Sequence, residues 1–426
     1  MEPTDRSKYD PRIDVLRAFA CGMVAVVHFS VPVWTDGIVE RGFILDTVAL
    51  AIIHTGWLGV PFFLFISGFS LALDKTRKTY ELDKKQFYIN RLLRIFPVWI
   101  TCILLLTFTR SLAGVNVFTL LLLQTQDIPK STAFNIAWSI QLEFMCYLLF
   151  PVLLAAAATR KNILPFYAFF LLVRVWLFFL STSMVHLLSY STVFGAGTIF
   201  LSGILASSLR PVTDRNVARA YLATGVVLFC AIAVFIYKSG GYQAPHGRLI
   251  HVFFLFMPEI LAGTLFLIVR GTITRIPNAA AAFGPAAIPS LRRAMKSFRS
   301  ALFNTFSHFG RVSYSAYMFS LFTLDFTMRV FFFLKPSGWL AMLTAWAFYF
   351  ATLTLFSTVS FYAIELPFLQ MRRRYVHSER DRHRTDRGEA GGDDGGALGQ
   401  LTGAKSVDSE DESRTTPQRR VSDEPA

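Results

Sequence analysis

Residues 13–34 read IDVLRAFACGMVAVVHFSVPVW, and this stretch decides how the whole chain is interpreted. It is about long enough to cross a bilayer core of roughly 30 Å as a helix. Yet it contains Asp14, Arg17 and His28. Ionisable groups at such a depth are costly unless they face a polar cavity, so they indicate a functional site. The alternative is a structural histidine that hydrogen-bonds a neighbouring helix.

The spacing of Arg17 and His28 places them on one face of the predicted helix. They lie 11 positions apart (28 − 17), which at about 100° per residue returns to within roughly 20° of the same face. The same spacing separates them by about 16 Å along the helix axis. One group is therefore expected near a membrane surface and the other well inside the membrane.

The composition favours an all-α polytopic membrane protein. Of the 426 residues, 53% are hydrophobic and only 16% are charged, whereas a soluble domain of this length would carry more charge. The formal net charge of +14 comes from short Lys and Arg clusters between apolar segments, which is typical of cytoplasmic loops and not of nucleic-acid binding. No metal site is predicted, because the four cysteines show no metal-ligand spacing and no disulfide framework.

Ten apolar segments are long enough to be predicted as membrane-spanning helices. They cover residues 13–34, 50–73, 91–109, 133–157, 162–181, 192–209, 217–237, 249–270, 309–333 and 339–363. Val115–Leu123 is only about half the length of a span and is predicted to be a partial or re-entrant helix. With ten spans the basic clusters all fall on one side, which the positive-inside rule assigns to the cytoplasm together with both termini.

Three regions follow from this topology: a cytoplasmic N-terminus at 1–12, a transmembrane domain at 13–372 and a tail at 373–426. The tail is polar and cannot bury enough apolar surface to fold, so we expect a disordered cytoplasmic segment. The basic and apolar loop at 271–300 is predicted to be an amphipathic piece at the inner membrane surface.

A pair of arginines opens the third apolar segment, which reads FYINRLLRIFPVW. Arg91 and Arg94 lie three positions apart and so share a helix face. Together with Arg17 at the same membrane boundary, they are predicted to form a cationic mouth. Guanidinium groups suit phosphate because they remain charged and donate in a planar, bidentate manner. The alternative is that both side chains snorkel to lipid headgroups.

A carboxylate is predicted at mid-membrane in the stretch AWSIQLEFMCYLLFP, where Glu143 lies about ten residues from the outer end. A buried carboxylate should pair with a cationic or polar group. By depth, His28 is the expected partner. Glu259 and Asp325 also fall near the midplane, and we rank both below Glu143 as functional candidates.

Several motifs occur in an order that resembles the membrane acyltransferase-3 family, the integral-membrane O-acyltransferases of bacterial surface glycans. They are Arg17 with His28, GVPFFLFISGF, RLLR, Trp138 with Glu143, GRVSYSAYMF and ELPF. The resemblance spans roughly residues 10–372. It implies a ten-helix bundle in the bacterial inner membrane that transfers an acyl group, usually acetyl, from acyl-CoA to a sugar hydroxyl. In one departure, Ser320 stands where many relatives have a histidine.

The resemblance also implies roles for the candidate residues. The family's essential Arg and His map onto Arg17 and His28, and its paired basic residues map onto Arg91 and Arg94. We therefore predict that the three arginines hold the nucleotide end of acyl-CoA, with acetyl-CoA as the expected donor. His28 is predicted to be the general base and Glu143 the group that orients it. An acyl-histidine intermediate is the alternative.

The expected partners are acyl-CoA, a carbohydrate acceptor on a lipid-linked or surface glycan, and membrane lipids, without nucleic acid. The main alternative is a proton-coupled transporter, because Arg, His and Glu inside a bundle also describe a proton relay. The sequence shows none of the internal repeats that many transporters have. A polysaccharide polymerase or flippase partner would need a large periplasmic loop, and none is visible.

Overall fold

The structure is a computed structural model of the chain. It describes residues 10–35, 51, 55–73, 80–109, 121, 137–159, 163–180, 192–239, 248–274, 289–334, 338–372 and 376–378. Most of these residues are helical, as expected where no water can bond to the backbone and each segment must satisfy its own polar groups. The predicted partial helix at Val115–Leu123 lies outside the described residues apart from Leu121.

The helices follow one another along the chain with short connections between several of them. The N-terminal set is α1 (Pro11–Thr35), η2 (Gly56–Leu58), α3 (Gly59–Ala72), α4 (Lys84–Thr109), α6 (Ala137–Thr159), α7 (Ile163–Leu180) and α9 (Val193–Ser208). The C-terminal set is α10 (Arg215–Lys238), α11 (Arg248–Thr272), α12 (Pro289–Arg311), α13 (Ser313–Leu334), α14 (Gly338–Ser360), the π-helix η6 (Phe361–Glu365) and α15 (Leu366–Gln370).

The helices confirm the predicted class of protein, though not the predicted number of spans. Among the described residues, 7 helices are long and apolar enough to cross a membrane. The apolar helices at Gly56–Ala72 and Val193–Ser208 are shorter. The chain is thus a multi-pass helical membrane protein by these criteria, and the count of ten spans is not confirmed.

The predicted span at 309–333 starts at the wrong residue. Helix α12 continues through the predicted start to Arg311, and α13 begins only at Ser313. The basic segment predicted at the inner surface overlaps α12, which exposes Phe298, Leu302 and Phe306. An amphipathic helix of this kind suits a membrane surface, and its location there stays a prediction.

Helices α3 and α9 cross in direct backbone contact. A Cβ atom added to Gly68 would lie 2.2 Å from the carbonyl oxygen of Phe200, and one added to Gly203 would lie 2.1 Å from that of Phe65. Only glycine allows this approach, which is how small residues pack helices in membranes. The crossing holds α3 in place beside the candidate site.

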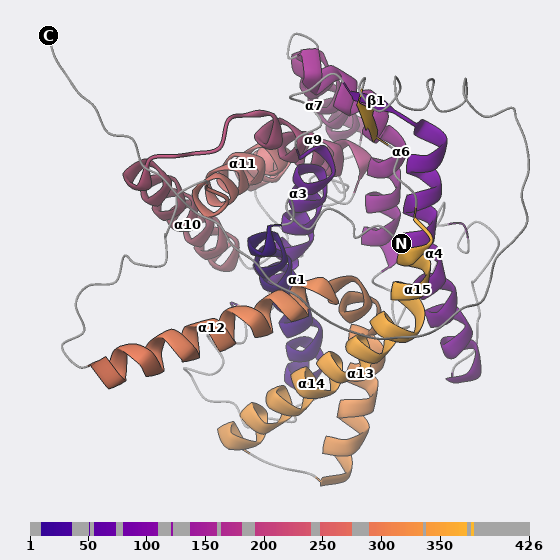
Figure 1. The fold of residues 1–426 in the computed structure, drawn as a ribbon, viewed down its shortest axis with the longest axis vertical. Helices are drawn as coiled ribbons and strands as arrows, with labels where there is room; N and C mark the ends of the chain where they lie inside the picture. The colour runs from indigo at the N-terminus through magenta and orange to yellow at the C-terminus, as the bar shows by residue number, and fades with distance from the viewer. Residues whose placement is uncertain are drawn as a thin grey trace, which may run out of the picture. The chain divides into compact units, whose positions relative to one another are not determined.

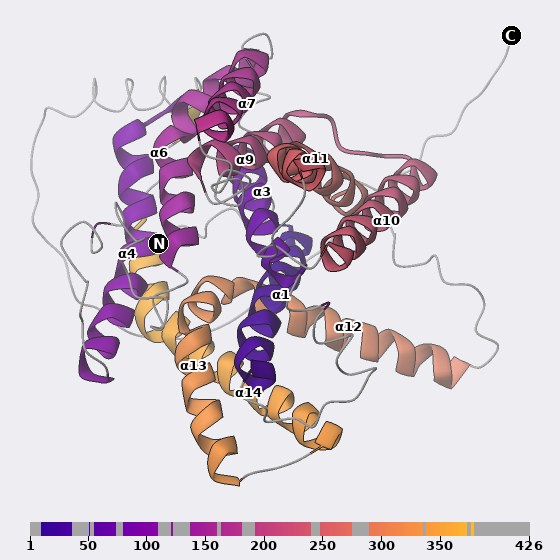
Figure 2. The ribbon, with the colours of Figure 1, turned by 180° about the vertical axis from the view of Figure 1, so that it is seen from behind.

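Helix α1 contacts α3, α12 and α13, and α3 also contacts α6 and α11. Figures 1 and 2 show α1 and α3 between α10 and α11 on one side and α13 and α14 on the other. A single buried apolar cluster includes side chains of α1, α3, α4, α6, α9 and α13, among them Phe65, Trp99 and Phe200. The first predicted helix is therefore central to the bundle.

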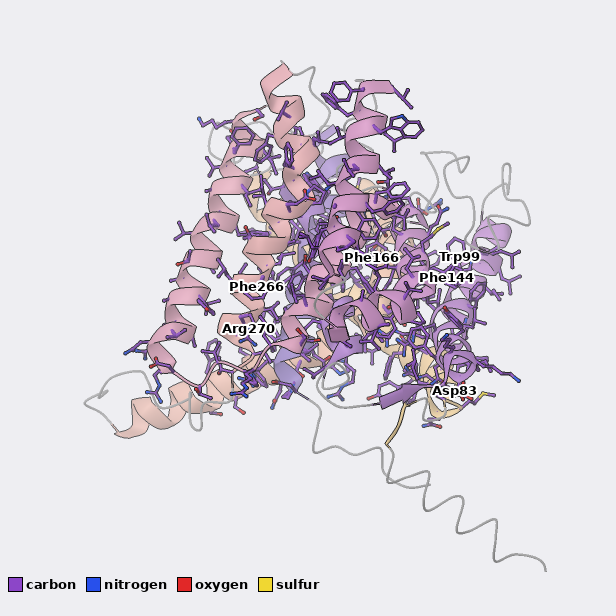
Figure 3. The ribbon with its side chains drawn as sticks, turned by 90° about the horizontal axis from the view of Figure 1, so that it is seen from above. Asp83, Trp99, Phe144, Phe166, Phe266 and Arg270 are labelled. Carbon is purple, nitrogen blue, oxygen red and sulfur yellow. The ribbon has the colours of Figure 1, made fainter. Side chains whose placement is uncertain are left out.

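Apolar and polar side chains separate along the helices, as Figure 3 illustrates. The labelled rings of Trp99, Phe144, Phe166 and Phe266 lie in one band, and Asp83 and Arg270 lie toward the same side of it. Arg270 donates to the carbonyl oxygens of Leu209 and Arg210. This pattern fits an apolar slab with polar residues at its edge.

The predicted tail at 373–426 includes one described segment. Residues Val376–Ser378 form strand β2, which pairs antiparallel with β1 (Tyr80–Leu82), with Tyr80 opposite Ser378. The pairing satisfies backbone groups of both segments, a stabilisation that composition alone does not reveal. Residues beyond 378, which make up most of the predicted tail, lie outside the described part of the chain.

Candidate functional site: a cationic pocket beside His28

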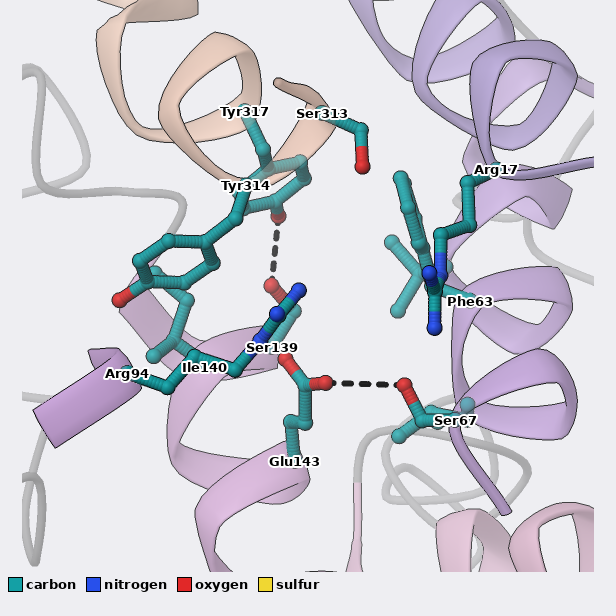
Figure 4. A pocket seen from close by; sticks show the side chains of 12 residues that line it. Arg17, Phe63, Ser67, Arg94, Ser139, Ile140, Glu143, Ser313, Tyr314 and Tyr317 are labelled. Carbon is teal, nitrogen blue, oxygen red and sulfur yellow. Dashed lines mark hydrogen bonds between the residues drawn. The ribbon is translucent and has the colours of Figure 1, made fainter. Parts of the chain in front are cut away.

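A pocket of about 550 Å³ opens among α1, α3, α4, α6 and α13. This figure includes space that is open to the surroundings. Apolar side chains such as Val60 and Phe63 form part of its wall. The charged groups in the wall are Arg17, Arg94 and Glu143. Figure 4 shows the two arginines reaching the pocket from opposite sides.

Arg17 enters the pocket from α1 and is held by two neighbours. Its guanidinium donates to the Asp14 carboxylate over 3.3 Å and to the Ser70 hydroxyl on α3 over 3.0 Å. Asp14 is only 1% exposed, so this ion pair compensates a buried carboxylate. Two anchors keep the cation facing the pocket.

Arg94 enters the pocket from α4 and interacts electrostatically with the Glu365 and Glu143 carboxylates. Its guanidinium carbon lies 5.9 Å from the centre of the Tyr314 ring, a favourable distance for a cation above an aromatic face. Within the described part of the chain, no side chain or carbonyl accepts a hydrogen bond from Arg94. The donors are thus available to an anionic ligand in the pocket.

Arg91 does not line the pocket, so the three predicted arginines do not all converge. Its guanidinium lies 5.6 Å from the ring centre of Phe87 and 5.5 Å from that of Tyr147. The side chain is buried. A step of three residues leaves the two side chains only about 60° apart around the helix, yet Arg91 lies against aromatic rings and Arg94 lines the pocket.

Glu143 lines the pocket but does not pair with His28. Its carboxylate accepts a hydrogen bond from Ser67 over 2.9 Å and another from Tyr147, four residues further along α6. It also interacts electrostatically with Arg17 and Arg94. Among the described residues, Glu143 is therefore surrounded by hydroxyl groups and the two arginines, and its role in orienting the imidazole stays a prediction.

His28 lies next to the pocket and not in its wall. Its Nδ1 atom is 3.1 Å from the hydroxyl oxygen of Ser320 on α13. Its ring centre is 6.3 Å from that of Tyr317, and Tyr317 does line the pocket. Tyr317 thus borders both the cationic pocket and the histidine. Its hydroxyl forms a short hydrogen bond, 2.5 Å, with Ser139 on α6.

The other two carboxylates that the sequence places near the midplane, Glu259 and Asp325, each have a cationic partner. Glu259 on α11 forms an ion pair with Arg174 on α7, and Arg174 is fully buried. Asp325 pairs over 3.0 Å with Arg329 one turn along α13, and both are exposed. Neither carboxylate lines the pocket.

Several pocket residues were missed from the sequence. Ser67, Ser139 and Tyr317 supply hydroxyl groups, and all three lie within the ordered motifs or next to them. The motif order was the available signal. Hydroxyl side chains inside apolar helices also bond to their own backbone, so composition alone does not single them out.

Comparison with known proteins identifies the family. Residues 10–363 match the family described as an acyltransferase domain. The chain belongs to the acyltransferase-3 family. Arg17, His28, Arg94 and Glu143 all lie inside the matched region.

This acyltransferase-3 chain is also similar to a curated protein of the Acidianus two-tailed virus, whose name provisionally calls it an acetyltransferase. The two chains are 32% identical over 168 residues. The match covers 38% of this chain and 46% of that protein, so the chain spans less than half of its length. No solved structure matches the chain.

Proposed function

We propose that this acyltransferase-3 protein transfers an acyl group, with acetyl as the expected case, from acyl-CoA to a carbohydrate hydroxyl. The observation that supports this proposal most directly is that two guanidinium groups, those of Arg17 and Arg94, line one pocket next to His28. Acyl-CoA carries phosphates and a long flexible arm that ends in the thioester. Phosphates suit guanidinium donors, and the arm would extend past Tyr317 toward the imidazole.

The reaction is direct attack of the acceptor on the thioester. The hydroxyl oxygen bonds to the thioester carbonyl carbon while the Nε2 atom of His28 takes the hydroxyl proton. The carbon–sulfur bond then breaks, and the imidazolium returns the proton to the departing thiolate, so that free CoA and the acylated sugar result. The hydroxyl groups of Tyr317 and Ser139, which hydrogen-bond to each other, would lie beside the reacting atoms.

Glu143 takes a different role from the one expected from the sequence. The Glu143 carboxylate interacts electrostatically with the cations Arg17 and Arg94. Its negative charge offsets part of the free energy that these cations lose when they are removed from water, so it stabilises the pocket while no acyl donor is bound. Arg91 is assigned to aromatic packing on α4 and not to phosphate binding. The cytoplasmic entry of acyl-CoA, the bacterial inner membrane and a glycan acceptor belong to this proposal as well.

The test uses the full chain in lipid nanodiscs with two donors. Acetyl-CoA carries phosphates, and acetyl-pantetheine lacks the nucleotide. Arg94→Gln should raise KM for acetyl-CoA by roughly 10-fold or more, the loss of one charge-assisted hydrogen bond, and should leave KM for acetyl-pantetheine unchanged. The matched control is Arg329→Gln on the exposed surface of α13, which should leave both values unchanged.

Two results would overturn the proposal. If Arg94→Gln changed KM equally for acetyl-CoA and acetyl-pantetheine, the phosphates of acetyl-CoA would not bind in this pocket. Substrate movement across vesicles without any CoA release would favour the transporter alternative. The acceptor is identified by mass spectrometry of glycans from cells with and without the protein, where one acyl increment is the expected difference.

A further inference from the structure

The hydroxyl group of Ser320 on α13 makes two hydrogen-bond contacts, one within its own helix and one with α1. Its oxygen lies 2.8 Å from the carbonyl oxygen of Tyr317 and 3.1 Å from Nδ1 of His28. The side chain is 1% exposed, so these partners are not replaced by bulk water. Both distances are normal for hydrogen bonds between heavy atoms.

Counting hydrogens decides the direction of each bond. A serine hydroxyl has one hydrogen to donate and two lone pairs to accept with. A carbonyl oxygen can only accept, so the hydroxyl hydrogen points to Tyr317. The Ser320 oxygen can then only accept from His28, and Nδ1 must carry the ring hydrogen.

The position of Ser320 is itself fixed by the neighbouring helix. Tyr349 on α14 donates its hydroxyl hydrogen to the backbone carbonyl of Ser320 over 3.2 Å. The ring of Tyr349 stacks on Phe29, the residue after His28, with centres 5.1 Å apart. Both Tyr349 and Phe29 are buried. These contacts hold the serine and the histidine in one register.

A neutral imidazole with hydrogen on Nδ1 keeps a lone pair on Nε2. Within the residues that the structure describes, no group hydrogen-bonds to Nε2 of His28. We propose that Ser320 is a positioning residue that holds His28 in the Nδ1–H tautomer and so leaves Nε2 able to accept a proton. This inference rests on the proposed function for its catalytic meaning, but the tautomer itself does not depend on it.

The first experiment therefore reads the tautomer and not the activity. The full chain is labelled with ¹⁵N in its histidine rings, and the signals of His28 among the 8 histidines are those that vanish in His28→Gln. At mildly alkaline pH the ring-nitrogen shifts should identify Nδ1 as protonated and Nε2 as bare. A protonated Nε2 in the wild-type protein would overturn the proposal, because Ser320 would then be donating to the ring.

The second experiment changes the serine. Ser320→Ala should convert His28 to a mixture of tautomers, whereas Ser320→Thr, which keeps the hydroxyl, should retain the Nδ1–H form. The matched control is Ser357→Ala, which removes another buried hydroxyl that bonds to its own helix backbone and should leave the His28 signals unchanged. Unaltered His28 signals in Ser320→Ala would contradict the inference.

Kinetics link the tautomer to the reaction. Ser320→Ala should lower kcat by roughly 10- to 100-fold, the scale seen when an outer partner of a functional histidine is removed, with KM for acetyl-CoA unchanged and activity restored in Ser320→Thr. A fall in kcat with an unchanged tautomer would refute the positioning role. If the wild-type protein transfers no acyl group, the proposed function fails, and the nitrogen shifts still decide the tautomer.

Discussion

The hydroxyl groups of Ser139 on α6 and Tyr317 on α13 lie 2.5 Å apart, and this contact fixes the ring that borders both the cationic pocket and His28. Two helices far apart in the sequence thus meet beside both the pocket and the histidine. A hydrogen bond of this kind contributes about 0.5–1.5 kcal/mol. Its loss should affect how the thioester is presented and not how the phosphates bind.

Tyr317→Phe should therefore lower kcat by about 2- to 10-fold and leave KM for acetyl-CoA unchanged. Steady-state kinetics of CoA release measure both values. The matched control is Tyr88→Phe, which removes a hydroxyl bonded to the carbonyl of Leu148 outside the pocket lining. A rise in KM without a change in kcat would place Tyr317 in donor binding instead.

His28→Gln should lower kcat by about 10² to 10⁴, the usual contribution of a general base. The amide keeps a polar side chain of similar reach but cannot accept and release the proton at neutral pH. The control is His308→Gln on α12, where the imidazole Nε2 lies 3.1 Å from the Thr358 hydroxyl. Near-normal turnover in a correctly inserted His28→Gln protein would refute the assignment.

Glu143→Gln combined with His28→Gln should show additive losses in kcat/KM, with a coupling energy under about 0.5 kcal/mol. The reason is that Glu143 contacts Ser67 and Tyr147 and makes no hydrogen bond to His28 in the described part of the chain. A double-mutant cycle measures the coupling. Strong coupling would mean that the carboxylate does orient the imidazole during the reaction.

Arg174→Met should destabilise the protein by about 1–3 kcal/mol, because it leaves the partly exposed Glu259 carboxylate without its cationic partner. Arg174 is fully buried and also donates to the carbonyl of Leu255 over 2.7 Å. Thermal unfolding in detergent measures the loss. Arg329→Met, which breaks the exposed pair with Asp325, should cost no more than about 1 kcal/mol, and equal losses would contradict the argument.

Gly68→Ala should destabilise the α3–α9 crossing by about 1–3 kcal/mol, since the added methyl meets the Phe200 carbonyl and overpacks the contact. The control is Gly263→Ala on α11, where an added Cβ meets nothing within 4 Å. That change should be neutral or stabilise the helix by up to about 1 kcal/mol. An unfolding midpoint for Gly68→Ala at or above that of Gly263→Ala would show that the helices separate easily.

The site was predictable from the sequence in its charged members only. An ionisable side chain in an apolar segment is costly, and this feature made Arg17, Arg94 and Glu143 candidates. All three line the pocket. Arg91 is also an ionisable residue in an apolar segment, yet its guanidinium lies against Phe87 and Tyr147. The serine and tyrosine hydroxyls carried no signal strong enough to separate them from ordinary helix residues.

The sequence by itself determined that the chain forms apolar helices, because each helix satisfies its own backbone hydrogen bonds and needs no distant residue to do so. The ordered motifs likewise indicated the family. Only the tertiary structure decided which side chains meet. His28 and Ser320 are separated by 292 positions, and their contact depends on how α1 and α13 are rotated and packed, which is set by long-range contacts and not by local pattern.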